Sequence, residues 1–244
     1  MDNIRIGLVL SDVLGTYGDD GNALVLRGRA RMRGMTADIV PIKLGEPVPD
    51  DLSCYTIGGG EDAAQVLAAE HLRTDGGLTR AAAAGRPIFA VCAGLQVLGV
   101  SFYAQGSAVD GLSLIDATTT PLPTRSIGEV SSAPTKAGIT RELTQPLTGF
   151  ENHLGGTVLG PDAEPLGTVR TGNGNGNGGS AGSARVEGVV QGSVIATYMH
   201  GPALARNPEL ADLILAQALD MPLSDLEPLA LPEVDRLRLE RLKG

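Results

Sequence analysis

Apolar and polar residues alternate along the first half of the chain in blocks that predict strands and helices in turn. The short apolar runs fit strands covered on both faces, and the longer stretches between them have helical spacing. The predicted strands are residues 4–10, 37–42, 52–57 and 88–91, and the predicted helical stretches are about 22–33, 63–69 and 78–84. This order predicts parallel βαβ units and therefore an α/β fold.

The second half has a different pattern. After Gly111, threonine, proline and glycine interrupt short apolar segments, which is typical of antiparallel strands. We expect such strands at residues 127–130, 147–150, 157–159, 184–190 and 193–199, and a closing helix at 210–219. Together the two halves predict a single domain over residues 1–244. It would contain a mixed, largely parallel sheet with helices on both faces and an antiparallel C-terminal portion.

Two segments near the C-terminus stand apart from this pattern. Residues 172–183 are a low-complexity Gly/Asn run whose Asn-Gly steps favour turns. We expect a mobile loop between two strands there, where an insertion does no harm. The tail at residues 236–243 is basic and amphipathic, and it fits either a solvated final helix turn or a docking surface for a partner.

Composition narrows the functional classes. The 244 residues are 42% hydrophobic and 19% charged, which fits an ordinary soluble globular protein. The net charge of −9 argues against nucleic acid as the main partner. Two cysteines and three histidines, with no Cys-x-x-Cys, form neither a disulfide framework nor a zinc pattern. No apolar run approaches the ~20 residues that span a bilayer, so we expect a cytoplasmic protein without direct membrane insertion.

The clearest chemical signal is a cysteine between a predicted strand and a helix-compatible segment. The apolar residues 88–91 lead into Cys92, and small residues follow it. A thiol at that point lies among unpaired backbone N–H groups at the positive end of a helix dipole, and both favour the thiolate. Cys92 is therefore a candidate nucleophile. The alternative is a small buried hydrophobe, which is what we expect of Cys54.

A thiolate that attacks a carbonyl also needs oxyanion donors and a proton carrier. The glycines at 58–60 follow a strand, so the N–H of Gly59 or Gly60 is expected to form an oxyanion hole with the N–H of Ala93. An ordinary glycine turn is the alternative. His200 follows the predicted strand at 193–199 and is the best general acid–base candidate, although a histidine in such a place is often structural.

The segment from Cys92 to Gln96 reads Cys-x-Gly-x-Gln and resembles the elbow of class I glutamine amidotransferases. The resemblance implies a flavodoxin-like α/β fold and a cysteine that attacks the side-chain amide of glutamine. A thioester forms, ammonia leaves, and water regenerates the enzyme. The family's histidine usually reads His-x-Glu, whereas residues 200–202 read His-Gly-Pro, so the local acid is missing. This resembles the cobyric-acid-synthase-like branch.

Within that branch the chain is most similar to the glutaminase subunits of lipid II isoglutaminyl synthases. Segments at 17–22, 58–65, 124–129 and 149–153 carry the similarity over most of the chain. The resemblance makes Cys92 the nucleophile, His200 the base and then the acid, and Arg125 the clamp on the α-carboxylate of glutamine. Gln96 is expected to form a polar wall. A guanidinium fork matches a carboxylate, although the residues alone favour a surface arginine at position 125.

The resemblance implies a subunit that hydrolyses L-glutamine and passes ammonia to a Mur-ligase-like synthetase. That partner would form a heterodimer with this chain and amidate D-glutamate of lipid II to D-isoglutamine. The chain has no Gly-x-x-x-x-Gly-Lys-Ser/Thr loop, so we expect no cofactor of its own and place ATP and Mg in the partner. Whether the partner also supplies the missing acid stays open at this point.

Two alternatives remain open at this point. One is a glutaminase for another acceptor such as a corrinoid carboxylate. In that case the amidotransferase domain usually follows a fused ATP-binding domain. The glutaminase pattern begins almost at residue 1 of this sequence, so we expect no room for such a domain. The other is a catalytically silent binding subunit that keeps the amidotransferase shape.

Overall fold

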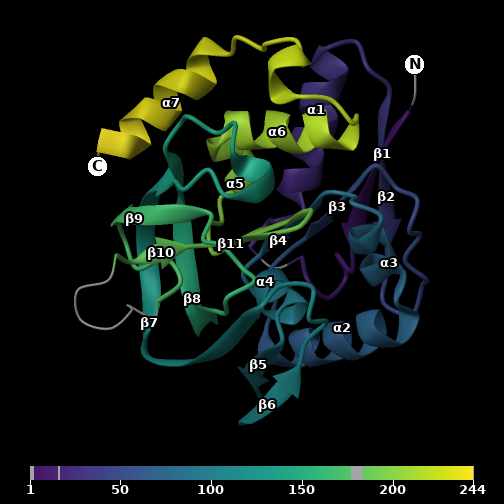
Figure 1. Cartoon of the computed structure of the whole chain (residues 1–244), viewed down its shortest axis with the longest axis vertical. Coiled ribbons are helices and arrows are strands. Elements are labelled where there is room, and N and C mark those ends of the chain that lie inside the picture. The colour runs from purple at the N-terminus through teal and green to yellow at the C-terminus, as the bar shows by residue number, and fades with distance from the viewer. Residues whose placement is uncertain (1–2, 16, 177–183, 244) are drawn as a thin grey trace.

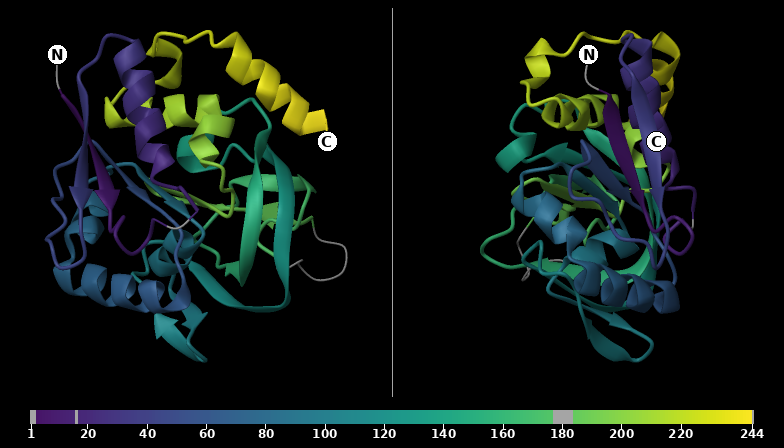
Figure 2. Two further views of the ribbon diagram at one scale, coloured as in Figure 1. Left: turned by 180° about the vertical axis from the view of Figure 1, so that it is seen from behind. Right: turned by 90° about the vertical axis from the view of Figure 1, so that its right-hand side faces the viewer.

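The computed structural model describes residues 3–15, 17–176 and 184–243. Within them the chain forms two six-stranded sheets (Figures 1 and 2). The first sheet has the strand order β11 (Val189–Gln191), β12 (Val194–Thr197), β4 (Ile88–Val91), β3 (Cys54–Ile57), β1 (Ile4–Val9) and β2 (Ala37–Ile42). All neighbouring pairs in it are parallel except β11 with β12.

The central strands of this sheet are covered on both faces. Every residue of β3, β4 and β12 is buried, which explains why these strands are short uninterrupted apolar runs in the sequence. Helices α1 (Gly21–Met32), α5 (Ala203–Arg206) and α6 (Pro208–Ala218) lie on one side of the sheet, and α2 (Asp62–Asp75), α3 (Gly77–Ala83) and α4 (Ala93–Leu98) lie on the other (Figure 1). The predicted α/β arrangement with helices on both faces is confirmed.

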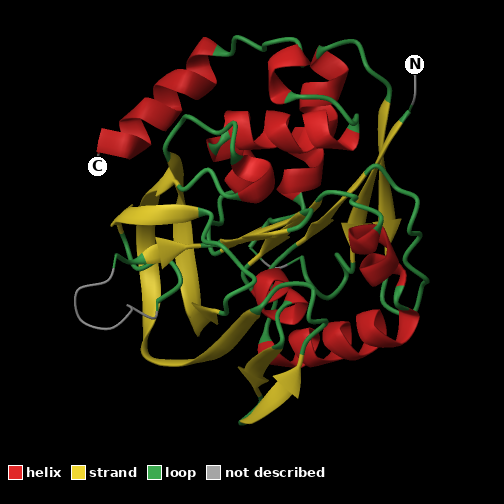
Figure 3. Ribbon diagram, in the orientation of Figure 1, coloured by secondary structure: helices red, strands yellow, loops and turns green. Residues whose placement is uncertain are grey.

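Most of the predicted antiparallel portion forms a sheet of its own (Figure 3), but the predicted strand at 193–199 joins the first sheet as β12, parallel to β4. The second sheet contains β10 (Val186–Glu187), β9 (Gly167–Thr171), β7 (Ala117–Pro134), β5 (Ser101–Ala104) and β6 (Ser107–Asp110), with β8 (Leu147–Leu159) paired to β7. The predicted strand at 127–130 is part of the much longer β7, and the predictions at 147–150 and 157–159 merge into β8. Strands β5, β6 and β9 were not predicted. The outer faces of these strands are exposed, so polar residues and glycines interrupt the apolar pattern.

The described part of the Gly/Asn run is more closely packed than the mobile loop that the sequence predicts. Residues 177–183 lie outside the described residues, but residues 172–176 pack against the second sheet. Asn175 is only 1% exposed, and its side chain bonds both the N–H and the carbonyl of Gly188. Gly188, with φ of 67°, divides the predicted strand at 184–190 into β10 and β11. This part of the run is a structural contact.

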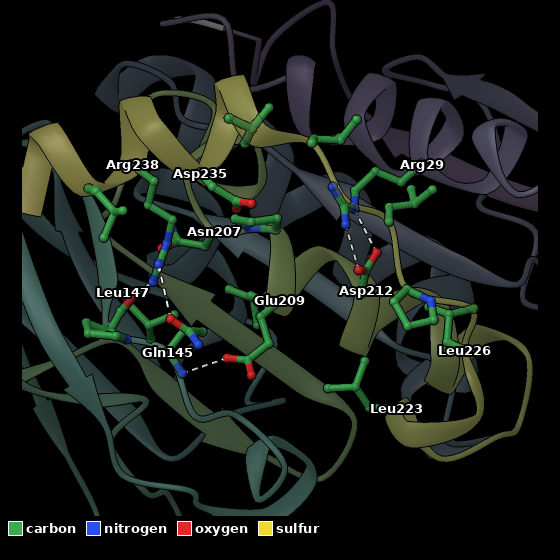
Figure 4. Close-up of a pocket in the computed structure, with 18 of the residues that line it drawn as sticks. Arg29, Gln145, Leu147, Asn207, Glu209, Asp212, Leu223, Leu226, Asp235 and Arg238 are labelled. Carbon is green, nitrogen blue, oxygen red and sulfur yellow. Dashed lines mark hydrogen bonds and ion pairs between the residues drawn. The ribbon is translucent and has the colours of Figure 1, made fainter.

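The C-terminal tail forms helix α7 (Pro232–Lys243), which begins earlier than the predicted segment. Arg238 is 9% exposed; its guanidinium donates to Gln145 Oε1 at 3.3 Å and to the carbonyl of Pro146. A cavity of about 520 Å³ lies beneath this helix (Figure 4). Neither Cys92 nor His200 lines it. The tail is thus anchored rather than simply solvated, and its cavity is separate from the candidate thiol site.

A buried ion pair beside this cavity ties α1 to α6. Arg29 donates to both carboxylate oxygens of Asp212 at 2.7 and 2.6 Å (Figure 4). Arg33 approaches the same group at 2.8 Å. The side chain of Arg29 is 7% exposed, that of Asp212 is 14% exposed and that of Arg33 is 1% exposed. The two helices are therefore joined through one shared carboxylate.

None of the described helices combines the length and the apolar character that a bilayer crossing requires. The His, Cys, Asp and Glu side chains of the described residues also form no group of three that would hold a metal ion.

Replacing Asp212 by alanine should lower the free energy of unfolding by about 3 kcal/mol or more, because two buried arginines lose their counter-charge. Urea denaturation measures the loss. Asp51→Ala is the control: its partner Arg5 lies at 3.1 Å, but the side chains of Arg5 and Asp51 are 42% and 68% exposed. That variant should cost less than about 1 kcal/mol. Equal losses in the two variants would contradict the role of the buried pair.

Candidate active site

The candidate residues meet at one edge of the first sheet. Strands β12, β4, β3 and β1 are neighbours and run parallel, so their carboxyl ends lie together. The segments that follow these ends carry His200, Cys92, the glycines at 58–60 and Asp19. Open parallel sheets bind ligands at this edge because the loops there converge. The topology explains how residues almost two hundred positions apart share one site.

Cys92 lies on a strained turn between β4 and α4. Its backbone has φ of 53° and ψ of −105°, a conformation that costs energy for any residue with a side chain. The Cys92 N–H donates to the carbonyl of Thr197 at 2.8 Å, which ties this turn to the end of β12. Gly94 fits closely beside it, because a Cβ there would lie 3.0 Å from the carbonyl oxygen of Ile57. The tight turn holds the thiol where the sheet ends.

His200 is held in place by contacts of both its backbone and its imidazole ring. It pairs with Phe150 of the second sheet through two backbone hydrogen bonds, of 2.9 and 3.1 Å. The Nδ1 atom lies 3.0 and 3.1 Å from the two carboxylate oxygens of Asp19. Both residues are buried, with 4% and 2% exposure. The carboxylate therefore orients the imidazole.

Cysteine, histidine and aspartate converge on Gly59. A Cβ placed on Gly59 would lie 3.1 Å from Asp19 Oδ2, 3.2 Å from His200 Cε1 and 3.5 Å from Cys92 Cβ. His200 Nε2 is buried without a hydrogen-bond partner among the described residues. The structure thus brings Cys92 and His200 together, and the glycine leaves room for all three side chains.

Electrostatics favour the protonated form of His200. Burial by itself lowers its pKa, but the hydrogen bond with Asp19 and the proximity of the Cys92 thiol outweigh burial and raise the pKa from 6.5 to about 10. A protonated imidazole beside a thiol stabilises negative charge on the sulfur.

Asp19 is a candidate site residue that the sequence did not single out. The sequence left open whether a partner supplies the missing acid, whereas Asp19 comes from the loop before α1 of this chain. The backbone carbonyl of Asp19 accepts the Asn22 side-chain amide at 2.9 Å, and its Oδ2 accepts the Gly59 N–H at 2.9 Å. Asp19 lies in the quoted segment 17–22, but the spacing along the chain does not link it to His200.

The Gly59 contact corrects one expectation about the oxyanion hole. Since the Gly59 N–H is bonded to Asp19, it is not free to receive an oxyanion in this structure. The N–H groups of Gly60 and Ala93 have no acceptor among the described residues. Those two groups remain the candidate donors.

A cavity of about 250 Å³ opens beside the thiol. Its lining includes Cys92, Gln96, Arg125, Glu61 and Tyr17. The Tyr17 hydroxyl donates to Glu61 Oε1 at 3.3 Å. Burial and the neighbouring Glu61 raise the pKa of Tyr17, while Arg125 acts in the opposite direction. A cation and an anion therefore face one small space together with the candidate nucleophile.

Arg125 reaches this space because β7 is irregular there. The register between β7 and β8 shifts between Pro121 and Ser126, and such a bulge redirects side chains. The Arg125 guanidinium donates to Asn152 Oδ1 at 2.9 Å. Arg125 is exposed, yet it lines the cavity rather than an unrelated surface.

Gln96 belongs to a buried polar wall behind the thiol. Its amide donates to the Tyr198 hydroxyl at 3.1 Å, and that hydroxyl lies 2.7 Å from Thr157 Oγ1. The ring of His153 stacks on Tyr198 with centroids 3.8 Å apart. The second sheet supplies Thr157 and His153, so both sheets build this wall.

With the geometry established, a model of the CobB/CobQ-like glutamine amidotransferase domain matches residues 5–208. The chain belongs to this family. The predicted resemblance to class I glutamine amidotransferases of this branch is confirmed.

Two curated relatives match over most of their length. The lipid II isoglutaminyl synthase (glutamine-hydrolyzing) subunit GatD of Staphylococcus aureus strain N315 is 32% identical, over 93% of this chain and 89% of the relative. The subunit of the same name from Streptococcus pneumoniae is 33% identical, over 88% of this chain and 80% of the relative.

Solved structures share the fold. The glutaminase domain of Trypanosoma brucei CTPS has a TM-score of 0.56 and 13% identity, and the match covers 90% of this chain and 95% of that domain. At this identity the likeness supports the α/β architecture alone, and the predicted amidotransferase-like fold is confirmed.

The raised pKa of His200 predicts a pH-dependent contribution to stability. Because the folded pKa of about 10 exceeds the ordinary value of 6.5, the stabilisation is complete below about pH 6.5 and is lost as the pH rises toward 10. The gap in unfolding free energy between the wild type and His200→Gln should therefore narrow between about pH 6.5 and about pH 9.5. Urea denaturation at several pH values measures this gap, and a constant or widening gap would count against the ion-paired histidine.

Proposed function

We propose that this protein hydrolyses L-glutamine to glutamate and ammonia, with Cys92 as nucleophile, His200 as proton carrier and Asp19 as the acid that orients it. The observation that carries the proposal is the convergence of these three side chains on Gly59, beside a cavity lined by Arg125 and Glu61. Membership of the glutamine amidotransferase family supports it.

The chemistry follows from the roles of these groups. The Cys92 sulfur attacks the carbonyl carbon of the glutamine side-chain amide, and the oxyanion that forms is held by the N–H groups of Gly60 and Ala93. His200 gives its proton to the amide nitrogen, the carbon–nitrogen bond breaks, and ammonia leaves. Water then attacks the thioester while His200 accepts a proton, and glutamate is released with the thiol restored.

The cavity suits a free amino acid. Its volume of about 250 Å³ lies below the ~300–1,000 Å³ of pockets for drug-sized ligands. A zwitterion needs a cation for its α-carboxylate and an anion for its α-ammonium group. Arg125 offers two parallel donors for the carboxylate, and Glu61 is the anion on the same cavity. Gln96 completes a polar wall beside the amide.

The ammonia acceptor belongs to the same proposal. Two relatives that match over 80% or more of their own length are glutamine-hydrolysing subunits of lipid II isoglutaminyl synthase. We therefore assign to this chain the role of a glutaminase subunit that supplies a Mur-ligase-like, ATP-dependent and Mg-dependent partner. The product of that partner would be lipid II with D-isoglutamine in place of D-glutamate.

Cys92→Ala should abolish ammonia release from glutamine, because no other residue can form the thioester. In the complex with the synthetase, it should abolish glutamine-driven amidation of lipid II and leave amidation by added ammonium unchanged. Ammonia release and product mass measure the two effects. Wild-type ammonia release by the alanine variant would exclude the mechanism, and mass spectrometry that identifies a corrinoid-synthesising partner would exclude the acceptor.

Glu61→Gln should raise the KM for glutamine about tenfold with little change in kcat, because it removes the counter-charge of the α-ammonium group. Glutaramate, which is glutamine without its α-amino group, should be used equally by the wild type and this variant. Arg125→Ala is the matched control and should raise the KM for both substrates, since both keep the carboxylate. An equal effect of Glu61→Gln on both substrates would argue against this recognition.

A further inference from the structure

Glu187 is a fully buried acid that the proposed reaction does not use. Its Oε1 atom accepts the Thr197 hydroxyl at 2.5 Å and the Tyr198 N–H at 2.9 Å. Its Oε2 atom is buried without a partner among the described residues. Burying a carboxyl group in which one oxygen has no hydrogen-bond partner is costly. The two hydrogen bonds to Oε1 offset that cost. The contacts of Glu187 are therefore concentrated on one short segment.

That segment joins the two halves of the proposed catalytic pair. The Thr197 carbonyl accepts the N–H of Cys92 at 2.8 Å, and the Thr197 hydroxyl accepts the N–H of Met199 at 3.0 Å. His200 is the next residue along the chain. A shift of Thr197 would therefore displace the thiol and the imidazole relative to each other.

The chain crosses from one sheet to the other at this point. Strand β12 stops pairing with β4 at Thr197, opposite Val91, and His200 pairs with Phe150 of β8. Tyr198 lies between these two pairings, where neither sheet provides an acceptor for its N–H. The Glu187 carboxyl provides that acceptor and so holds the bend that leads to His200.

Asn175 fixes the turn that carries Glu187. Its Oδ1 atom accepts the Gly188 N–H at 2.7 Å, and its Nδ2 atom donates to the Gly188 carbonyl at 3.1 Å. Gly188 has φ of 67°, and a Cβ there would lie 2.6 Å from the Ala196 carbonyl oxygen. The glycine and the asparagine together define where β10 ends and therefore where the Glu187 carboxyl lies.

From these contacts we propose that Glu187 is a positioning residue, which holds the bend at Thr197 and Tyr198 and so sets the approach of His200 to Cys92. Asn175, in the Gly/Asn run, holds Glu187 in place. The inference rests on the proposed glutaminase function. Burial, with a smaller effect of Glu151, raises the pKa of Glu187 to about 7 against the lowering effect of its two hydrogen bonds. Oε1 accepts in either protonation form, so glutamine is a fitting replacement.

Steady-state hydrolysis of glutamine by four variants tests the proposal. Glu187→Ala should lower kcat about 100-fold and leave KM within about twofold, because a small displacement of reacting groups has effects of this size while the cavity is unchanged. Glu187→Gln should stay within about threefold of the wild type, since its amide oxygen accepts the same two bonds. Asn175→Ala should lower kcat about tenfold. Glu209→Ala is the control: it removes a carboxylate that holds Thr144 and Gln145 beside the separate cavity, and it should not change kcat.

A second measurement does not depend on glutamine. The rate at which iodoacetamide alkylates Cys92 should fall in Glu187→Ala toward the rate of His200→Gln, and should be retained in Glu187→Gln. Cys54 does not interfere, because it is fully buried and burial raises its pKa to about 12. If the wild type fails to hydrolyse glutamine, the proposed function fails while alkylation still tests the positioning role. Wild-type kcat and alkylation in a folded Glu187→Ala variant would overturn the inference, as would a Glu187→Gln variant as slow as the alanine variant.

Discussion

The site depends on one buried carboxylate. Asp19 accepts the Gly59 N–H with one oxygen and contacts the imidazole of His200 with both. A carboxyl group this deeply buried is costly unless its neighbours contribute hydrogen bonds and charge, and His200 and Gly59 contact it at hydrogen-bond distance. The same contact raises the pKa of His200 and orients its ring toward Cys92. The loop before α1, the glycine turn and His200 are therefore coupled through this one carboxyl group.

The parallel sheet makes this coupling possible. Four adjacent parallel strands end at one edge, so the loops after β1, β3, β4 and β12 meet there. The strained backbone of Cys92 is held by the Thr197 carbonyl on one side and by the close fit of Gly94 on the other. Strain of this kind persists because neighbouring contacts over-determine the turn.

The second sheet contributes side chains that line the cavity beside the thiol. It supplies Arg125, redirected by a bulge in β7, and the partners of the Tyr198 hydroxyl behind Gln96. It also receives His200 through the pairing with Phe150. The nucleophile belongs to one sheet and much of the proposed substrate wall to the other. Contacts that set the spacing between the sheets, such as that of Glu187 with Thr197 and Tyr198, can therefore influence catalysis without touching the substrate.

The amino-acid pattern alone identified the parallel strands, because residues buried on both faces leave uninterrupted apolar runs such as 88–91. It also singled out Cys92, since a cysteine between a strand and small residues is a local signal, and the motif from Cys92 to Gln96 indicated the family. Only parts of the long strands β7 and β8 were predicted, because one face is in solvent and their apolar pattern is broken. Asp19 was unassigned because its partner His200 is distant in sequence and near only once four strands align. Tertiary contacts, which no spacing along the chain encodes, likewise set the hydrogen bond of the Gly59 N–H, the buried position of Asn175 and the bonds of Glu187.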